Sequence, residues 1–155
     1  MSARKAGRIV AADTSFLFSL LGKDFNTDEA LAVVGELSES LTLSPVNDLE
    51  LINASLMAEF QGFKAPGFSA RMETMLKAEH AAGRFRYPPF NPAKAIARAT
   101  ELSRRHTLTQ GHRTYDVLLV AAAIELGATD FLTFDARQAR LAEAEGLVLW
   151  GVALG

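Results

Sequence analysis

Four carboxylates stand where the sequence predicts that a strand ends or a helix begins: Asp13, Glu50, Asp116 and Asp135. The chain has no cysteine and no pair of histidines in a ligand pattern, which argues against a zinc site. Carboxylate oxygens are the hard ligands that Mg²⁺ and Mn²⁺ prefer. Such an ion can hold a phosphate oxygen, help to deprotonate water and neutralise the charge of an in-line displacement. Together the four acids predict a Mg²⁺ or Mn²⁺ site that acts on phosphate groups.

Each acid also has a purely structural interpretation. Asp13 precedes Thr14 and could cap the helix that follows, and Asp135 could likewise cap the helix after it. The helix dipole alone favours a carboxylate at Asp116 and at Asp135. Glu50 could be a rim residue or an ion-pair partner beside an apolar stripe that consists of Leu49, Ile52, Leu56 and Phe60. The metal hypothesis therefore depends on the set of four acids and not on any single member.

Short apolar runs alternate with helical patterns along the chain. Strands are predicted at 7–13, 41–44, 130–134 and 147–152, and helices at 14–22, 26–38, 45–60, 69–82, 93–105, 114–127 and 136–146. The segments 85–92 and 106–113 are predicted to be loops. The alternation favours one domain, residues 1–155, with a three-layer α/β/α fold around a central parallel sheet. In such a sheet the strand ends that carry Asp13 and Asp135 meet at the edge where ligands bind.

Composition limits the function less sharply. The net charge is −2, but residues 84–113 carry seven basic residues against Glu101 alone, which indicates either a phosphate-binding face or a solvated helix and loop. The longest apolar run, VLLVAAAI, is far below the roughly 18 residues that a membrane span needs. The basic N-terminus lacks the apolar stretch of a signal peptide. We therefore expect a cytoplasmic protein without a membrane partner.

Three segments carry a family resemblance: VAADTSFLFSLL, ELINA and YDVLLVAAAIELGATDFLTFDARQARLAEAEGL. They resemble the successive motifs of PIN-domain proteins, above all the VapC-type toxins of bacterial toxin–antitoxin pairs. The resemblance runs in order from Ile9 to Leu147. The residues that match the family motifs are Asp13, Thr14, Ser15, Glu50, Asn53, Ala54, Asp116, Thr133 and Asp135.

The resemblance implies a PIN-like fold and a Mg²⁺- or Mn²⁺-dependent endoribonuclease that is the toxin of a type II toxin–antitoxin pair. It implies that the four acids are catalytic metal ligands and that Thr14 and Thr133 are supporting hydroxyls. The implied partners are an RNA substrate, a cognate antitoxin and a second copy of the chain. At Leu119 the sequence departs from a histidine that is frequent in this subgroup, which bears on subgroup membership or substrate preference.

Two residues near the predicted site could contact RNA. The planar guanidinium of Arg113 suits a bidentate contact to the scissile phosphate, although an ordinary surface arginine is the alternative. His112 lies four residues before Asp116 and could contact phosphate or orient water, and a polar loop residue is the alternative.

Other enzyme classes fit the sequence less well. A haloacid-dehalogenase-type phosphatase would need an acid at Ser15, a dinucleotide-binding enzyme would need glycines after the first strand, and a receiver domain would need a second acid at Ala12. Two alternatives within the resemblance stay open. One is a PIN nuclease of RNA processing outside any toxin–antitoxin pair, and the other is a non-catalytic PIN-like module that binds RNA or protein.

Overall fold

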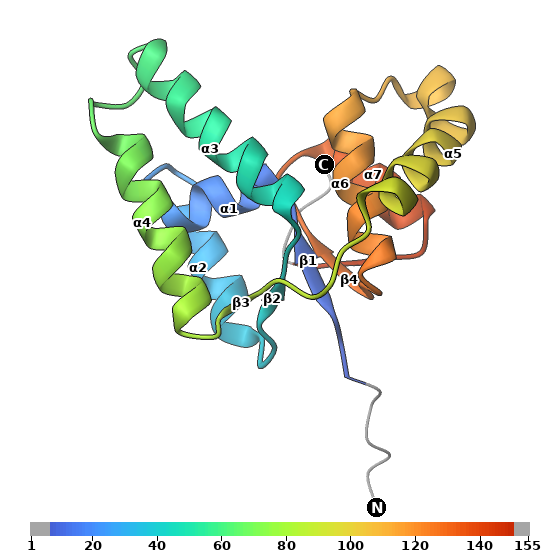
Figure 1. Ribbon diagram of the computed structural model, residues 1–155, viewed down its shortest axis with the longest axis horizontal. Coiled ribbons are helices and arrows are strands. Elements are labelled where there is room, and N and C mark those ends of the chain that lie inside the picture. Colours follow the sequence, from blue (N-terminus) through green and yellow to red (C-terminus); the bar gives the residue numbers. More distant parts are fainter. Residues whose placement is uncertain (1–6, 151–155) are drawn as a thin grey trace, which may run out of the picture.

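Five short parallel strands lie at the centre of the computed structural model, which describes residues 7–150 (Figure 1). Their order across the sheet is β3-β2-β1-β4-β5, and every neighbouring pair is parallel. The strands are β1 (Val10–Ala12), β2 (Leu41–Thr42), β3 (Phe85–Arg86), β4 (Asp130–Leu132) and β5 (Val148–Leu149).

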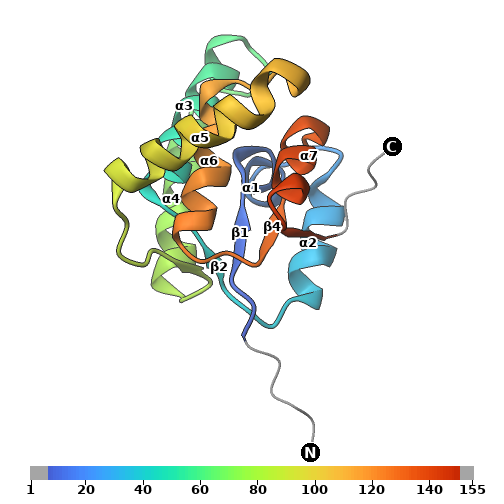
Figure 2. The same cartoon turned by 90° about the vertical axis from the view of Figure 1, so that its right-hand side faces the viewer.

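Helices cover both faces of this sheet, which confirms the three-layer α/β/α prediction. On one side lie α1 (Thr14–Leu21), α2 (Thr27–Glu36), α3 (Pro45–Phe60) and α4 (Phe68–Ala81). On the other side lie α5 (Pro92–Gln110), α6 (Thr114–Glu125) and α7 (Ala136–Ala144). Figure 2, turned by 90°, shows α5 and α6 side by side in front of the sheet.

Alternating side chains of the strands divide the core into two clusters. In β1, Val10 and Ala12 belong to the cluster under α1–α4, whereas Ala11 belongs to the cluster under α5–α7. Both sides of the strand are buried, since all three residues are at most 2% exposed. Burial on both faces explains why β1 is a continuous apolar run rather than an alternating one.

The sequence predicted a loop over residues 85–92. This prediction is wrong at its start, because the segment begins with β3. Leu41 pairs with Phe85 and Thr42 with Arg86, and the Phe85 ring is buried at the edge of the sheet. The strand ends at Arg86, two residues before Pro88. The prolines of this segment favour a loop, so the sequence pattern does not show the short strand.

The predicted loop at 106–113 is also wrong over most of its length, because α5 continues to Gln110. The helix ends at Gly111, which adopts a left-handed φ of 69° and donates its N–H to the Thr107 carbonyl. Thr107 and Thr109 are weak helix formers, yet the helix passes through both and ends only at the glycine. The last predicted strand, 147–152, is observed as β5 over Val148–Leu149 only. Residues 151–152 lie outside the described part of the chain.

Among residues 7–150, no helix is both long enough and apolar enough to cross a membrane. The longest helix, α5, is largely polar on its outer face and packs along α6.

Two leucines of α5 provide a matched test of this packing. Leu102 is fully buried against α6, whereas Leu108 is 99% exposed about one and a half turns later. Leu102→Ala should lower the free energy of unfolding by about 2–5 kcal/mol because it leaves a cavity. Leu108→Ala should change it by less than about 0.5 kcal/mol. Chemical denaturation of both variants measures the difference, and equal effects would contradict the observed position of α5.

Candidate functional site

The candidate site lies where the direction of strand order reverses. From β1 the chain continues to β2 and β3 on one side, and it returns to place β4 and β5 on the other. Ala12 pairs with Leu132, so Asp13 and Thr133 are the next residues on two adjacent strand ends. The reversal leaves a crevice beyond the carboxyl ends of the strands, which is the usual ligand position in open parallel sheets.

Asp13 is buried, and protein donors hold both oxygens of its carboxylate. Oδ1 accepts hydrogen bonds from the Ser15 hydroxyl at 2.7 Å and from the Phe16 N–H at 2.9 Å, which makes Asp13 the N-cap of α1. Oδ2 accepts a short hydrogen bond from the Thr133 hydroxyl, 120 residues later in the chain. The carboxylate therefore joins β1, α1 and the end of β4.

Thr133 and Ser15 connect this carboxylate to Asp135. The Thr133 hydroxyl accepts the Asp135 N–H at 2.9 Å, and the Ser15 hydroxyl accepts the Phe134 N–H at 3.0 Å. Ser15 was not among the predicted supporting residues, although it directly follows Asp13 and Thr14 in the sequence. A hydroxyl two residues after a helix-capping acid is the signal that could have identified it.

Asp135 is the N-cap of α7, as its structural interpretation predicted. Its Oδ1 accepts the N–H groups of Arg137 at 2.8 Å and Gln138 at 3.1 Å, while the residue itself is exposed. One carboxylate oxygen is thus sufficient for the cap. Capping does not exclude a second role for the other oxygen.

Glu50 and Asp116 face the crevice from helices on opposite sides of the sheet. Together they line a cleft of about 600 Å³ between α3 and the start of α6. Glu50 Oε2 is buried without a hydrogen-bond partner in residues 7–150, and the same holds for the neighbouring Thr14 hydroxyl. The Thr14 hydroxyl is near enough to lower the pKa of Glu50, although no hydrogen bond of normal length joins them.

Two buried amides that the sequence analysis did not single out fix these helices. The Asn47 side chain donates to the Ala12 carbonyl at 2.8 Å and accepts the Ser44 N–H at 2.9 Å, which ties the start of α3 to the end of β1. The Gln138 side chain donates to the Asp116 carbonyl at 3.0 Å, which ties α6 to α7. Asn47 could have been found as the third helical residue of a capping box that opens at Ser44.

The four acids act on one another electrostatically. Burial raises the pKa of Asp13 from 3.8 to about 7, with a smaller contribution from the charge of Asp135. Burial first, and then the charge of Asp135, raises the pKa of Asp116. Burial and the charge of Asp116 raise the pKa of Glu50. The four carboxylates therefore share one electrostatic environment, and their mutual repulsion favours a cation or protonation.

The oxygen donors suit a hard divalent cation in kind, and Glu50 Oε2 is buried without a hydrogen-bond partner among residues 7–150. In the part of the chain that the structure describes, however, no three His, Asp or Glu side chains are arranged to hold a metal ion together. Both oxygens of Asp13 accept protein hydrogen bonds instead. The four acids thus lie around one crevice, but their oxygens do not meet at a single metal position in this structure.

The two predicted RNA contacts differ in their surroundings. Arg113 is exposed, lines the same cleft as Glu50 and Asp116, and its charge counteracts the rise in the pKa of Asp116. His112 is 9% exposed and its Nε2 lies 2.6 Å from the Gln110 side-chain oxygen. Burial lowers the pKa of His112, which keeps the ring neutral at pH 7. Of the two, only Arg113 is open to a ligand in this conformation.

The basic segment 84–113 is not a continuous phosphate-binding face. Three of its arginines are paired with carboxylates: Arg84 with Glu79, Arg98 with Glu125 and Arg105 with Glu145. Two arginines of α7, Arg137 and Arg140, instead lie close enough to His112 to lower its pKa. Leu119, at the position of the absent histidine, is 2% exposed and belongs to the interior.

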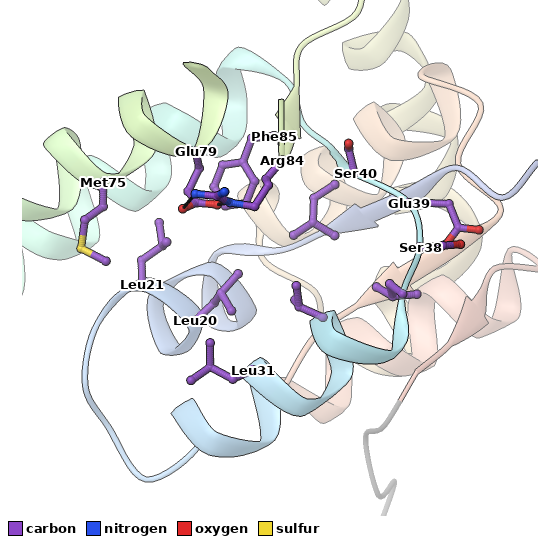
Figure 3. Close-up of a pocket in the computed structure, with 13 residues that line it drawn as sticks. Leu20, Leu21, Leu31, Ser38, Glu39, Ser40, Met75, Glu79, Arg84 and Phe85 are labelled. Atoms are coloured by element: carbon purple, nitrogen blue, oxygen red, sulfur yellow. Dashed lines mark hydrogen bonds and ion pairs between the residues drawn. The ribbon is translucent and has the colours of Figure 1, made fainter. Parts of the chain in front are cut away.

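A separate apolar cavity of about 490 Å³ lies between α1, α2, β2 and α4 (Figure 3). Leucines of α1 and α2 form one wall, and Met75 of α4 and Phe85 of β3 contribute to the other. The Arg84–Glu79 ion pair lies at this second wall. None of the four acids lines this cavity.

The buried acids give the cation-free protein a defined pH dependence. Asp13 binds its proton more tightly when folded, since its pKa rises from 3.8 to about 7. The stabilisation from this proton is complete below about pH 4 and is lost as the pH rises through 7, at up to about 1.4 kcal/mol per pH unit. Unfolding free energies from pH 4 to 8 should fall over this range, and Asp13→Asn should flatten the curve. A wild-type curve that rises instead would contradict the burial of Asp13.

Known proteins share this architecture. The Mycobacterium tuberculosis toxin VapC20, described as cleaving the Sarcin-Ricin loop, is 18% identical with a TM-score of 0.65, covering 90% of this chain and 96% of its own. VapBC2 from Rickettsia felis, solved with a promoter DNA fragment, is 19% identical with a TM-score of 0.63 and coverages of 91% and 96%. FitAcB from Neisseria gonorrhoeae is 16% identical with a TM-score of 0.58, again covering 91% and 96%.

At these identities the solved structures establish the fold alone. No curated protein matches the sequence significantly. A family model described as the PIN domain matches residues 10–144, which include all four acids. Because this match spans most of the sequence, the chain belongs to the PIN domain family.

Proposed function

We propose that this protein is a Mg²⁺- or Mn²⁺-dependent endoribonuclease and the cytoplasmic toxin of a type II toxin–antitoxin pair. The observation that carries the proposal is the group of four electrostatically coupled acids at the reversal point of the sheet. Membership of the PIN domain family, a nuclease family, supports it. The solved structures with this fold include the toxin VapC20, described as cleaving the Sarcin-Ricin loop.

In this proposal the residues that would hold the cation are Asp13, Glu50, Asp116 and Asp135. When bound, the ion supplies Lewis acidity to the phosphate and lowers the pKa of a water. The Ser15 and Thr133 hydroxyls fix the orientation of the Asp13 carboxylate. Arg113 binds the scissile phosphate at the wall of the cleft. Glu50, whose Oε2 has no protein partner among the described residues, either completes the set of cation ligands or acts on the attacking water.

Asp135 allows the catalytic and the structural role of one acid to be separated. Asp135→Asn keeps a side-chain oxygen for the cap but removes the charge, so stability should persist while the RNA cleavage rate falls at least about a hundredfold. Asp135→Ala should lose cleavage and also about 1 kcal/mol of stability. Cleavage in Mg²⁺ or Mn²⁺ and chemical denaturation give the two measurements. If Asp135→Asn cuts RNA at the wild-type rate, Asp135 is only a cap.

Two alternatives remain as second candidates. A PIN nuclease of RNA processing would cut RNA but would have no antitoxin gene beside it, so the neighbouring reading frame discriminates between the two nuclease proposals. A non-catalytic module would bind RNA or protein without cutting. The presence of all four acids, whose charges act on one another, favours a catalytic site over a module that only binds.

We place the antitoxin in the apolar cavity between α1, α2, β2 and α4. Two of the solved structures with this fold are described as complexes, VapBC and FitAB. The cavity is mainly apolar, none of the four acids lines it, and it carries exposed aliphatic groups such as Leu31, which is 54% exposed. For the second copy of the chain, we assign the part of α3 where Leu56 and Phe60 are both more than half exposed.

Leu31 allows the antitoxin contact to be tested in cells. Inducible expression of the wild type should arrest growth and degrade RNA, and co-expression of the neighbouring small protein should relieve both effects. Leu31→Asp buries a charge in the proposed interface, so the variant should stay toxic but escape neutralisation. Leu108→Asp, which changes a fully exposed side chain of α5, is the matched control, and the antitoxin should neutralise it normally. Normal neutralisation of Leu31→Asp would place the antitoxin elsewhere.

A further inference from the structure

We propose that Arg137 and Arg140, on the exposed face of α7, bind a backbone phosphate beside the scissile one and so direct the RNA out of the crevice over α7. This inference rests on the proposed nuclease function and adds two substrate-positioning residues to it. Its basis is the position of the two guanidinium groups, their lack of carboxylate partners among residues 7–150, and the different charge on the two sides of the crevice.

The exposed face of α7 carries both arginines. The helix begins directly after Asp135, and its buried side consists of Gln138, Ala139, Leu141 and Ala142. Arg137 and Arg140 are both exposed, and residues three positions apart in a helix lie on the same face. The two guanidinium groups therefore project from one side of α7, within its first two turns after an acid of the candidate site.

Both arginines lie near the turn between α5 and α6, which leads into the cleft. The Arg137 guanidinium approaches the Gly111 carbonyl, with 3.5 Å between Nη1 and the oxygen. Burial lowers the pKa of the next residue, His112, and the positive charges of Arg137 and Arg140 lower it further. Arg113 follows in the chain and lines the 600 Å³ cleft that contains two of the acids. Three guanidinium groups are thus grouped at the edge of the acid crevice.

The two arginines have no carboxylate partner in the described part of the chain. Three arginines of the basic segment 84–113 form ion pairs, whereas neither Arg137 nor Arg140 forms one among residues 7–150. Asp135, two residues before Arg137, instead uses its Oδ1 to accept backbone N–H groups of α7. Positive charges that lie close together without a counterion repel one another, and a bound anion relieves this repulsion. The pair of arginines therefore favours a negatively charged group of the substrate.

The two sides of the crevice differ in charge. On the α1 side lies a cleft of about 440 Å³ whose lining includes Ser15, Asp24 and Asp135. Among the described residues, no lysine or arginine lines this cleft, so its carboxylates repel a phosphate. On the side of the α5–α6 turn lie Arg113 and the two arginines of α7. A strand that carries one charged phosphate per nucleotide is therefore attracted to the arginine side.

The chemistry of the guanidinium group suits a role in positioning. Its planar fork binds two phosphate oxygens at once in a fixed geometry. In the proposed function Arg113 binds the scissile phosphate, and the covalent backbone then determines how far away the next phosphate lies. Contacts from Arg137 and Arg140 to that neighbouring phosphate set the register of the strand on the acids without touching the reacting atoms.

Binding is best measured in the Asp13→Asn background, where the RNA stays intact. Fluorescence anisotropy with a short unstructured labelled RNA should show that Arg137→Gln and Arg140→Gln each weaken binding by about tenfold. The slope of log affinity against log salt should become shallower by about 0.7 for each variant, the value for one phosphate contact on a single strand. Arg71→Gln is the matched control, because it removes an exposed charge from α4 on the other side of the sheet. It should leave both quantities unchanged.

A double-mutant cycle tests for direct contact with one phosphate. An uncharged methylphosphonate replaces the phosphates of the RNA one position at a time. At one position this change should weaken binding to the background protein as much as Arg137→Gln does, and it should cause no further loss in the Arg137→Gln protein. Losses that add at every position would overturn the proposed contact. All of these variants alter exposed residues, so their folding is expected to be normal.

Cleavage by proteins with Asp13 intact separates this inference from the proposed function. Arg140→Gln should raise KM and leave kcat at saturating RNA nearly unchanged, since the residue positions the strand and does not act on the reacting atoms. If the wild type cuts RNA and Arg140→Gln binds and cuts equally well, the positioning inference is overturned and the nuclease stands. Unchanged RNA binding together with lost neutralisation by the antitoxin would assign the arginines to that protein and also overturn the inference. If the wild type cuts no RNA, the nuclease proposal fails, and the binding cycle still decides whether Arg137 contacts a phosphate.

Discussion

The buried carboxylate of Asp13 is the point on which the site depends. Three donors hold it: the Ser15 hydroxyl and the Phe16 N–H at the start of α1, and the Thr133 hydroxyl after β4. These bonds join the two strands at the reversal point of the sheet and start the first helix. They also offset part of the cost of burying an acid, although its pKa still rises to about 7. The rest of the crevice is built around this one costly group.

The surrounding elements carry the other acids to the same place by ordinary means. The amide of Asn47 ties α3 to the end of β1, and thereby positions Glu50 one turn later. The amide of Gln138 ties α6 to α7, and thereby positions Asp116 beside Asp135. In addition to burial, the charge of Asp135 raises the pKa of Asp116, and the charge of Asp116 raises the pKa of Glu50. Such repulsion destabilises a purely structural cluster, whereas it favours the binding of a divalent cation or a proton.

The sequence was sufficient for the parts of the fold with strong local signals. The parallel sheet, the strand-end positions of Asp13 and Asp135, and the capping role of Asp135 follow from apolar runs and cap residues. It was insufficient where long-range contacts decide. β3 forms because Phe85 is buried beside β2, which the nearby prolines conceal, and α5 passes through Thr107 and Thr109 because it packs along α6. Ser15 and Asn47 have local capping signals, but Ser15 also contacts Phe134 and Asn47 contacts Ala12. These partners are far apart in the sequence, so no periodicity predicts the contacts.

The central claim is that the four acids together bind a divalent cation. Isothermal titration of Mn²⁺ into the wild type and into Asp13→Asn measures it most directly, without any RNA or turnover. We expect saturable binding to the wild type, and binding weakened by at least about tenfold in the variant, which loses one charged ligand. Equal Mn²⁺ affinity in the two proteins, or no saturable binding to the wild type, would contradict the account.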